Sequence, residues 1–205
     1  LKALDDREIA KKTLVIVTSD NGGAQTISRN LPLSGAKQML LEGGIRVPLI
    51  LRWPGVLPEG SEFSSPVTAM DLTATVAAAG NARPQQNKPF DGLDLTPFLT
   101  GRAELPADRP LFFRRRNVTV RKNQNLIRQS AVRQGDWKYL RTYNMKDNSK
   151  FTAALYNLKD DIAETENLAA SHGKKMNALS KLLDEWESEM SRTAMPFESA
   201  RRDKK

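Results

Sequence analysis

The chain has 205 residues, of which 27% are charged and 39% are hydrophobic, a composition that indicates a folded globular protein and excludes a disordered one. No stretch approaches the roughly 20 consecutive apolar residues of a membrane helix, and the absence of cysteine excludes disulfides and thiolate metal sites. The net charge of +8 favours polyanionic partners, whether nucleic acid, anionic lipid or sulfated and phosphorylated substrates, without choosing among them.

The first half of the chain predicts helices that alternate with short strands. The apolar, β-branched run at residues 13–17 is typical of a strand covered on both faces, as in a parallel sheet. Gly80 and Asn81 are expected to end an Ala- and Thr-rich helix. The expected elements are the end of a helix at 1–12, strands at 13–17 and 48–52, and helical segments at 67–79 and 93–100.

After about residue 106 the pattern changes to strands with partial alternation. Gly135 and Asp136 predict a tight turn between two of them, and hence a small antiparallel sheet. The expected strands are 111–113, 130–133, 137–143 and 154–156. Apolar residues then recur at helical spacing and predict one amphipathic helix that covers the sheet: Met176, Leu179, Leu182, Leu183, Trp186 and Met190.

The stretch TSDNGG, residues 18–23, directly follows the first predicted strand. Asp20 and Asn21 place hard oxygen ligands at a strand end, where α/β sheets usually carry their sites, and such oxygens suit calcium or magnesium. The two glycines that follow let the backbone turn sharply and approach a ligand. Taken alone, however, Asp-Asn-Gly-Gly is more often a plain turn.

The second notable stretch is GAKQMLLEGGIRVP, residues 35–48. Lys37 lies in a polar loop, where its ammonium could meet an anion, although a solvated lysine is the commoner reading. Glu42 and Arg46 are four residues apart, but two glycines separate them, so we expect a loop salt bridge and not a helical pair.

Six stretches, in this order, resemble the type I sulfatases of the alkaline phosphatase superfamily, and most of all the bacterial arylsulfatase and N-acetylgalactosamine-6-sulfatase-like members. The resemblance implies an α/β fold, in which residues 1–105 are the C-terminal portion of a mixed-sheet sulfatase core. Residues 106–205 would be a small antiparallel subdomain covered by one C-terminal helix. The stretches are TLVIVTSDNGG, GAKQMLLEGGIRVPLILRWPG, PVTAMDLTATVAAAG, FDGLDLTPFLTG, AVRQGDWKYLR and LYNLKDDIAETENLA.

The resemblance also implies residue roles. In such enzymes the strand-end Asp and Asn ligate the active-site cation, usually calcium, which corresponds to Asp20 and Asn21 here, with magnesium as the alternative. The lysine five residues before Glu-Gly-Gly contacts the substrate sulfate, which corresponds to Lys37. Sulfate ester cleavage builds charge on sulfonyl oxygens, and a hard cation and an ammonium can stabilise that charge.

Sulfatases of this type attack sulfur with a formylglycine made from a Cys/Ser-x-Pro-x-Arg motif, and this motif is absent here. The nearest match, Ser64-Ser65-Pro66-Val67-Thr68, has threonine in place of arginine and precedes a later helix, so we reject it as a nucleophile. The single histidine, His172, is expected at the surface beside the last helix. The chain start, Leu1-Lys2-Ala3-Leu4, looks cut from a helix. We therefore expect the C-terminal half of a sulfatase, inactive alone, whose missing N-terminal half carries the formylglycine.

The predicted reaction is sulfate ester hydrolysis on a sulfated sugar or aryl ester. One alternative is a non-catalytic remnant or scaffold that binds acidic glycans through a basic cluster around residues 114–128, which otherwise reads as a solvated loop. The other is a phosphoesterase or phosphonate hydrolase of the same superfamily. The acidic residues at 160–166 are expected to form a solvated turn. No nucleic-acid or membrane partner is expected, and only the family suggests a periplasmic or extracellular location.

Overall fold

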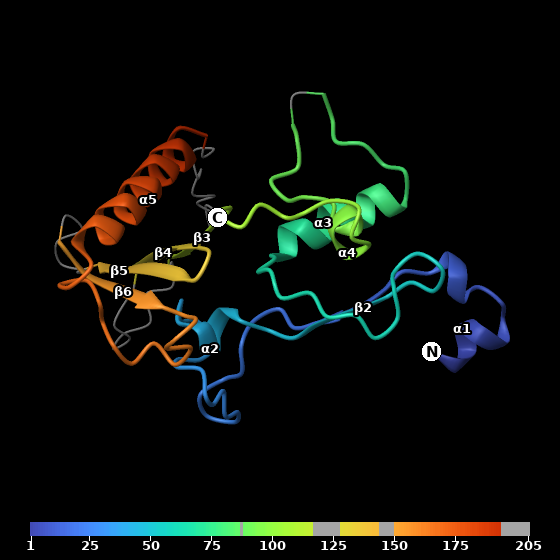
Figure 1. The fold of residues 1–205 in the computed structure, drawn as a ribbon, viewed down its shortest axis with the longest axis horizontal. Coiled ribbons are helices and arrows are strands. Elements are labelled where there is room, and N and C mark those ends of the chain that lie inside the picture. The colour runs from blue at the N-terminus through green and yellow to red at the C-terminus, as the bar shows by residue number, and fades with distance from the viewer. Residues whose placement is uncertain (87, 117–127, 144–149, 194–205) are drawn as a thin grey trace, which may run out of the picture.

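The computed structural model describes residues 1–86, 88–116, 128–143 and 150–193 (Figure 1). These residues form two sheets, one of two strands and one of four. The helices and strands are α1 (Lys2–Asp6), a 3-10 turn η1 (Ala10–Lys12), β1 (Val15–Thr18), α2 (Glu42–Ile45), β2 (Leu49–Arg52), α3 (Ala69–Ala79), α4 (Thr96–Leu99), β3 (Pro110–Arg116), β4 (Arg128–Gln134), β5 (Trp137–Tyr143), β6 (Phe151–Asn157) and α5 (Gly173–Thr193). Within these residues no helix is long and apolar enough to cross a membrane.

The first strand is not the doubly covered parallel strand that the sequence suggested. β1 pairs with β2 in antiparallel register, with Val17 opposite Ile50, and the two strands form a ribbon that extends away from the larger sheet (Figure 1). Val17 is 56% exposed and Ile50 is 62% exposed. A short β-branched run reports strand propensity but carries no information about its pairing partner, so this part of the prediction was wrong.

The second half of the chain confirms the predicted antiparallel sheet. β3, β4, β5 and β6 pair with their sequence neighbours, and the turn between β4 and β5 uses Gly135 at φ +60°. The long helix α5 covers one face of this sheet (Figure 1). The segment that leads into α2 packs on the opposite face through Leu40, which contacts Ala131 and Leu140. The four-stranded sheet is therefore covered on both faces.

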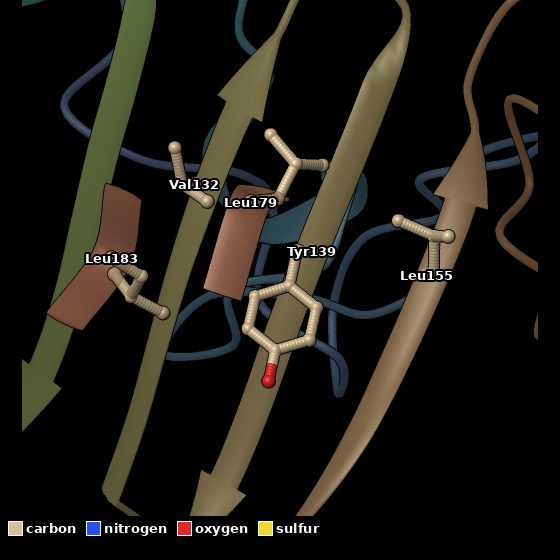
Figure 2. Close-up of a cluster of buried hydrophobic side chains, with 5 residues drawn as sticks. All are labelled: Val132, Tyr139, Leu155, Leu179 and Leu183. Carbon is tan, nitrogen blue, oxygen red and sulfur yellow. The ribbon is translucent and has the colours of Figure 1, made fainter. Parts of the chain in front are cut away.

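The main core lies between α5 and the sheet. Figure 2 shows side chains from β4, β5 and β6 meeting two leucines of the helix. The predicted helical stripe is confirmed, because Leu179 and Leu183 are fully buried there. The core residues are Val132, Tyr139, Leu155, Leu179 and Leu183, with Met176, Leu182 and Trp186 packed against them.

Helix α3 is anchored by a buried carboxylate. Asp71 is fully buried and accepts a hydrogen bond from the backbone N–H of Thr68, which closes a capping box at the helix start. The guanidinium of Arg109 donates to both Asp71 oxygens, at 3.1 and 2.6 Å. Burial alone would raise the pKa of Asp71, but the hydrogen bonds from Arg109, Leu93 and Thr68 hold it below the ordinary value.

Two expectations about charged residues are corrected. Glu42 does begin a short helix, α2, in spite of the glycines that follow, and Arg46 Nη1 lies 3.6 Å from Glu42 Oε2 in helical spacing. Glu164, expected in a solvated turn, is only 6% exposed. The reason is a tertiary contact with residues far away in sequence, which the local acidic pattern could not reveal.

Candidate functional site

The two notable sequence stretches meet in one corner of the fold. The N–H of Gly22 donates to the carbonyl of Gly44 at 3.0 Å, and the N–H of Lys37 donates to the carbonyl of Gly23 at 3.0 Å. The side chain of Asn30 accepts from the N–H of Gly23 and donates to its carbonyl, both at 3.1 Å. The end of β1 and the loop before α2 are therefore joined by backbone hydrogen bonds. We refer to residues 20–23 together with Lys37 as the Asp20–Lys37 corner.

Close backbone approach explains the glycines of both stretches. A Cβ atom at Gly22 would overlap the carbonyl oxygen of Gly43, and one at Gly43 would lie 2.6 Å from the carbonyl oxygen of Ser34. A Cβ at Gly44 would lie 2.5 Å from the carbonyl oxygen of Ala36. Only residues without a side chain allow these segments to pack so tightly.

A groove opens beside this corner, with a volume of about 1200 Å³. The residues that line it come from the end of β1, from α2 and β2, and from strands β3 and β4 of the larger sheet. Asp20 and Asn21 both line the groove; Asp20 is exposed and Asn21 is half-buried. This volume is larger than the roughly 300–1,000 Å³ of typical small-molecule pockets, so the groove has room for a ligand of that class.

Lys37 joins the corner through its backbone, which bonds to Gly23, and not through its side chain. Its side chain is exposed, and Lys37 is not among the residues that line the groove, although its neighbour Gln38 is. The fold thus joins the backbone segments of all three predicted site residues, and two of the three residues, Asp20 and Asn21, line the same groove.

Asp20 and Asn21 offer the kind of oxygen ligand that a hard cation prefers, but they supply fewer ligands than such an ion needs. A carboxylate and an amide oxygen at a strand end suit calcium, which takes six to eight oxygen ligands. Within residues 1–86, 88–116, 128–143 and 150–193, no group of three or more His, Cys, Asp or Glu could hold a metal ion. Asp20 and Asn21 can therefore form part of such a site, and the remaining ligands would have to come from elsewhere.

The candidates that the sequence argument rejected have ordinary structural roles. Thr68, which occupies the arginine position of the serine motif, makes a hydrogen bond with Asp71 at the start of α3, and Ser64 is exposed at the groove. His172 is exposed immediately before α5, with its Nδ1 3.0 Å from Ser171 Oγ. The exposed position of His172 beside α5 is the one that the sequence suggested.

The basic cluster is partly engaged with aromatic rings. Arg114 lies 5.9 Å from the ring centroid of Trp186, and Arg128 lies 4.1 Å from that of Tyr143. Arg121 and Lys122 lie outside the described residues.

One set of residues beside the corner was missed from the sequence. Lys138 of β5 is completely buried, and its ammonium lies 2.9 Å from Glu42 Oε1 and 2.8 Å from Glu164 Oε1. Burial raises the pKa of the Glu164 carboxyl, and the Lys138 ammonium offsets this only in part. A signal did exist, because Lys138 and Leu140 alternate onto the same face of a strand, and a lysine there must be paired if that face is covered.

The known proteins that this chain resembles in sequence are sulfatases. The Sulfatase family model matches residues 1–82. Human Arylsulfatase H is 40% identical over 117 residues, which are 50% of this chain and 20% of that protein. Dog N-acetylgalactosamine-6-sulfatase is 38% identical over 120 residues, 56% of this chain and 23% of that protein. A Sulfatase of Formosa agariphila is 32% identical over 170 residues, 80% of this chain and 30% of that protein.

The solved structures agree with these matches. The crystal structure of Ps i-CgsB superposes with a TM-score of 0.74 at 31% identity, over 90% of this chain and 38% of that one. A second structure, solved with its substrate D-glucosamine-2-N,6-O-disulfate, has the same fold, with a TM-score of 0.74 at 22% identity over 94% of this chain and 37% of that one.

These comparisons confirm the resemblance that six sequence stretches indicated. They also show how much of each relative the resemblance covers. The chain spans between 20% and 30% of the length of the curated relatives described above. Within that span the chain is similar to sulfatases: the Sulfatase family model matches residues 1–82, and the Sulfatase of Formosa agariphila aligns with 80% of this chain.

Proposed function

We propose that this chain supplies one wall of the active site of an enzyme that hydrolyses sulfate esters. The observation that carries the proposal is the pair of backbone hydrogen bonds, Gly22 to Gly44 and Lys37 to Gly23, which brings both sequence stretches to one end of a groove. In this proposal Asp20 and Asn21 hold a divalent cation, and Lys37 binds the sulfate group.

The chemistry of Asp20 and Asn21 supports calcium, with magnesium as the alternative. Both side chains offer hard oxygens on the groove, and the glycines after them keep the surrounding backbone compact. When bound, the cation would supply positive charge for the sulfonyl oxygens as the ester bond breaks. Asp20 and Asn21 would hold that cation at the end of β1.

Lys37 is suited to the same anion by position and by length. Its backbone is fixed to Gly23, so its flexible stem starts within the corner and its ammonium, a compact point charge, can turn toward an anion at the groove. The exposed side chain has no cost of breaking a buried contact to do so.

The rest of the catalytic machinery is proposed to come from polypeptide outside this chain. The attacking group would be a formylglycine on that polypeptide, together with further metal ligands. The apolar pair Val17 and Ile50, 56% and 62% exposed on the β1–β2 ribbon, is a suitable contact for it. In this arrangement residues 1–105 belong to the sulfatase core, and residues 106–205 form the smaller subdomain behind it.

A sulfated sugar is the proposed substrate class. The solved structures that resemble this chain include Ps i-CgsB bound to k-i-k-neocarrahexaose, at 29% identity and a TM-score of 0.74. The net charge of +8 supports an anionic ligand in general. An aryl sulfate is the simplest substrate that retains the reacting group.

The test compares 4-nitrophenyl sulfate with 4-nitrophenyl phosphate on the full-length protein. We expect sulfate ester turnover that EDTA abolishes and added calcium restores, with much slower phosphate release. Faster turnover of the phosphate ester would assign the protein to the phosphoesterases of the same superfamily. Binding of a sulfated oligosaccharide without turnover of either ester would instead indicate a non-catalytic glycan-binding protein.

A further inference from the structure

The buried charges behind the corner form a compact group that we call the Lys138 clamp: Glu42, Lys138 and Glu164. Their side chains are 3%, 0% and 0% exposed. Besides the two ion pairs to Lys138, the N–H of Glu42 donates to Glu164 Oε2 at 2.6 Å. One ammonium thus links a strand of the sheet, the first residue of α2 and a loop 122 residues away from α2 in sequence.

Such a group needs a reason beyond stability. Removing three charges from water carries a large desolvation cost, and apolar side chains of similar volume often serve a core as well or better. A buried charged group can add a defined geometry, because its ion pairs form only when the partners are held in one arrangement.

The Lys138 clamp contacts the segment that packs against the Asp20–Lys37 corner. Glu42 is followed directly by Gly43 and Gly44; the N–H of Gly43 donates to Ser34 at 2.7 Å, and the carbonyl of Gly44 accepts from Gly22. On the same face of the sheet, the N–H of Leu40 donates to Gln129 Oε1 at 3.3 Å. The contact path therefore runs from β5 through Glu42 to the residues that follow Asp20 and Asn21.

We propose that Lys138 is a positioning residue for the Asp20–Lys37 corner, acting through Glu42 and its two glycines. This inference rests on the proposed function, since it assigns the four-stranded sheet the task of holding the anion site in shape. Lys138 itself does not reach the groove: it is fully buried, and the groove lining does not include it.

Loss of the ammonium should create a pH-dependent defect. In Lys138→Met the carboxylates of Glu42 and Glu164 would remain buried without their shared cation, and protonation at lower pH would relieve their repulsion. The other charged groups around them are Arg46 and Arg133, each 3.6 Å from Glu42 Oε2, and Asp136, which acts on Arg133. The phenol of Tyr156 interacts electrostatically with Glu164 and with Asp161.

Amide hydrogen exchange on the full-length protein tests the proposal without any sulfate substrate. We expect Lys138→Met to lower the protection factors of the Gly22 and Lys37 amides by about tenfold or more at pH 7.5. Protection should return at pH 5.5, and it should return at pH 7.5 when Glu164→Gln is added to Lys138→Met. Lys138→Arg, which keeps the charge, should retain most of the protection.

Three results would overturn the proposal. They are unchanged protection in folded Lys138→Met, an equal loss at both pH values, and a variant that stays unfolded at both. The last two would show that Lys138 only fills volume. Because exchange is measured apart from turnover, a loosened corner in a protein that cleaves no sulfate ester would leave the clamp standing and remove the proposed function. Unchanged exchange in Lys138→Met, in a protein that does cleave sulfate esters, would remove the clamp proposal and leave the proposed function standing.

Discussion

At the scale of single residues, the candidate metal ligands can be tested apart from catalysis. Asp20 is exposed on the groove and contributes the only negative charge of the proposed Asp20–Asn21 ligand pair. Asp20→Ala should weaken calcium binding by about tenfold or more, because affinity of a calcium site follows the number of charged ligands. Isothermal titration of the full-length protein with calcium measures this effect.

The control is Asp91→Ala, which removes an exposed aspartate that does not line the groove. Equal calcium affinity in wild type, Asp20→Ala and Asp91→Ala would show that Asp20 belongs to a turn and not to a metal site.

The sequence predicted part of the site and not the tertiary contacts around it. The position of Asp20 and Asn21 after a strand could be read directly, because apolar runs and glycines are local signals. The burial of Glu164 could not, because its partner residue, Glu42, is 122 positions away. The overlap that a side chain at Gly22 would create with Gly43 likewise depends on two segments meeting in space.

At the scale of elements, the packing of α5 on the sheet is a quantitative prediction. Leu183 is fully buried between the helix and strands β4, β5 and β6. Leu183→Ala should lower the free energy of unfolding by about 2 to 5 kcal/mol, through lost apolar burial and the cavity that remains. Urea denaturation followed by circular dichroism measures it, with the neighbouring, half-buried Leu182→Ala as a control that should cost less. Equal losses would show that the helix face is assigned wrongly.

The buried Asp71 carboxylate that anchors α3 leads us to expect a free energy of unfolding that falls at acidic pH. The pKa of Asp71 is below its ordinary value of 3.8 because the hydrogen bonds to Arg109 and the backbone outweigh its burial. Its contribution is therefore complete above pH 3.8 and is lost as the pH falls through the lower folded-state value.

Asp71→Asn should remove about 3 kcal/mol at pH 7 and flatten the fall in stability at acidic pH, since a buried charge pair is broken. Unfolding midpoints between pH 2 and 7 measure both effects, with exposed Asp91→Asn as the control. A variant whose acid profile matches wild type would show that Asp71 carries no depressed pKa.

Element prediction succeeded where periodicity was long and failed where it was short. Strand β5 has seven residues and helix α5 has 21, and the patterns of both were recognised. β1 has four residues, which are too few to indicate its pairing partner. The sequence suggested a parallel strand, whereas β1 pairs with β2 in antiparallel register. Helix α2, also of four residues, includes two glycines that propensity assigns to a loop.

At the scale of the whole molecule, the four-stranded sheet lies between α5 and the loop that carries the corner (Figure 1). Sequence stretches in the right order indicated the family and the antiparallel subdomain. They did not show that the four-stranded sheet contacts the segment next to the corner through Lys138, because that contact depends on which strand face meets Glu42. The proposed active site thus depends on both halves of this chain as well as on polypeptide outside it.

The central claim is that Lys37 binds the sulfate group beside Asp20 and Asn21, and turnover of 4-nitrophenyl sulfate by full-length Lys37→Ala tests it most directly. Lys12→Ala, an exposed lysine outside the corner, is the matched control. Loss of an ammonium that stabilises charge in the transition state should lower kcat/KM by about a hundredfold or more, while Lys12→Ala stays at the wild-type value. A kcat/KM for Lys37→Ala equal to that of Lys12→Ala would contradict the account.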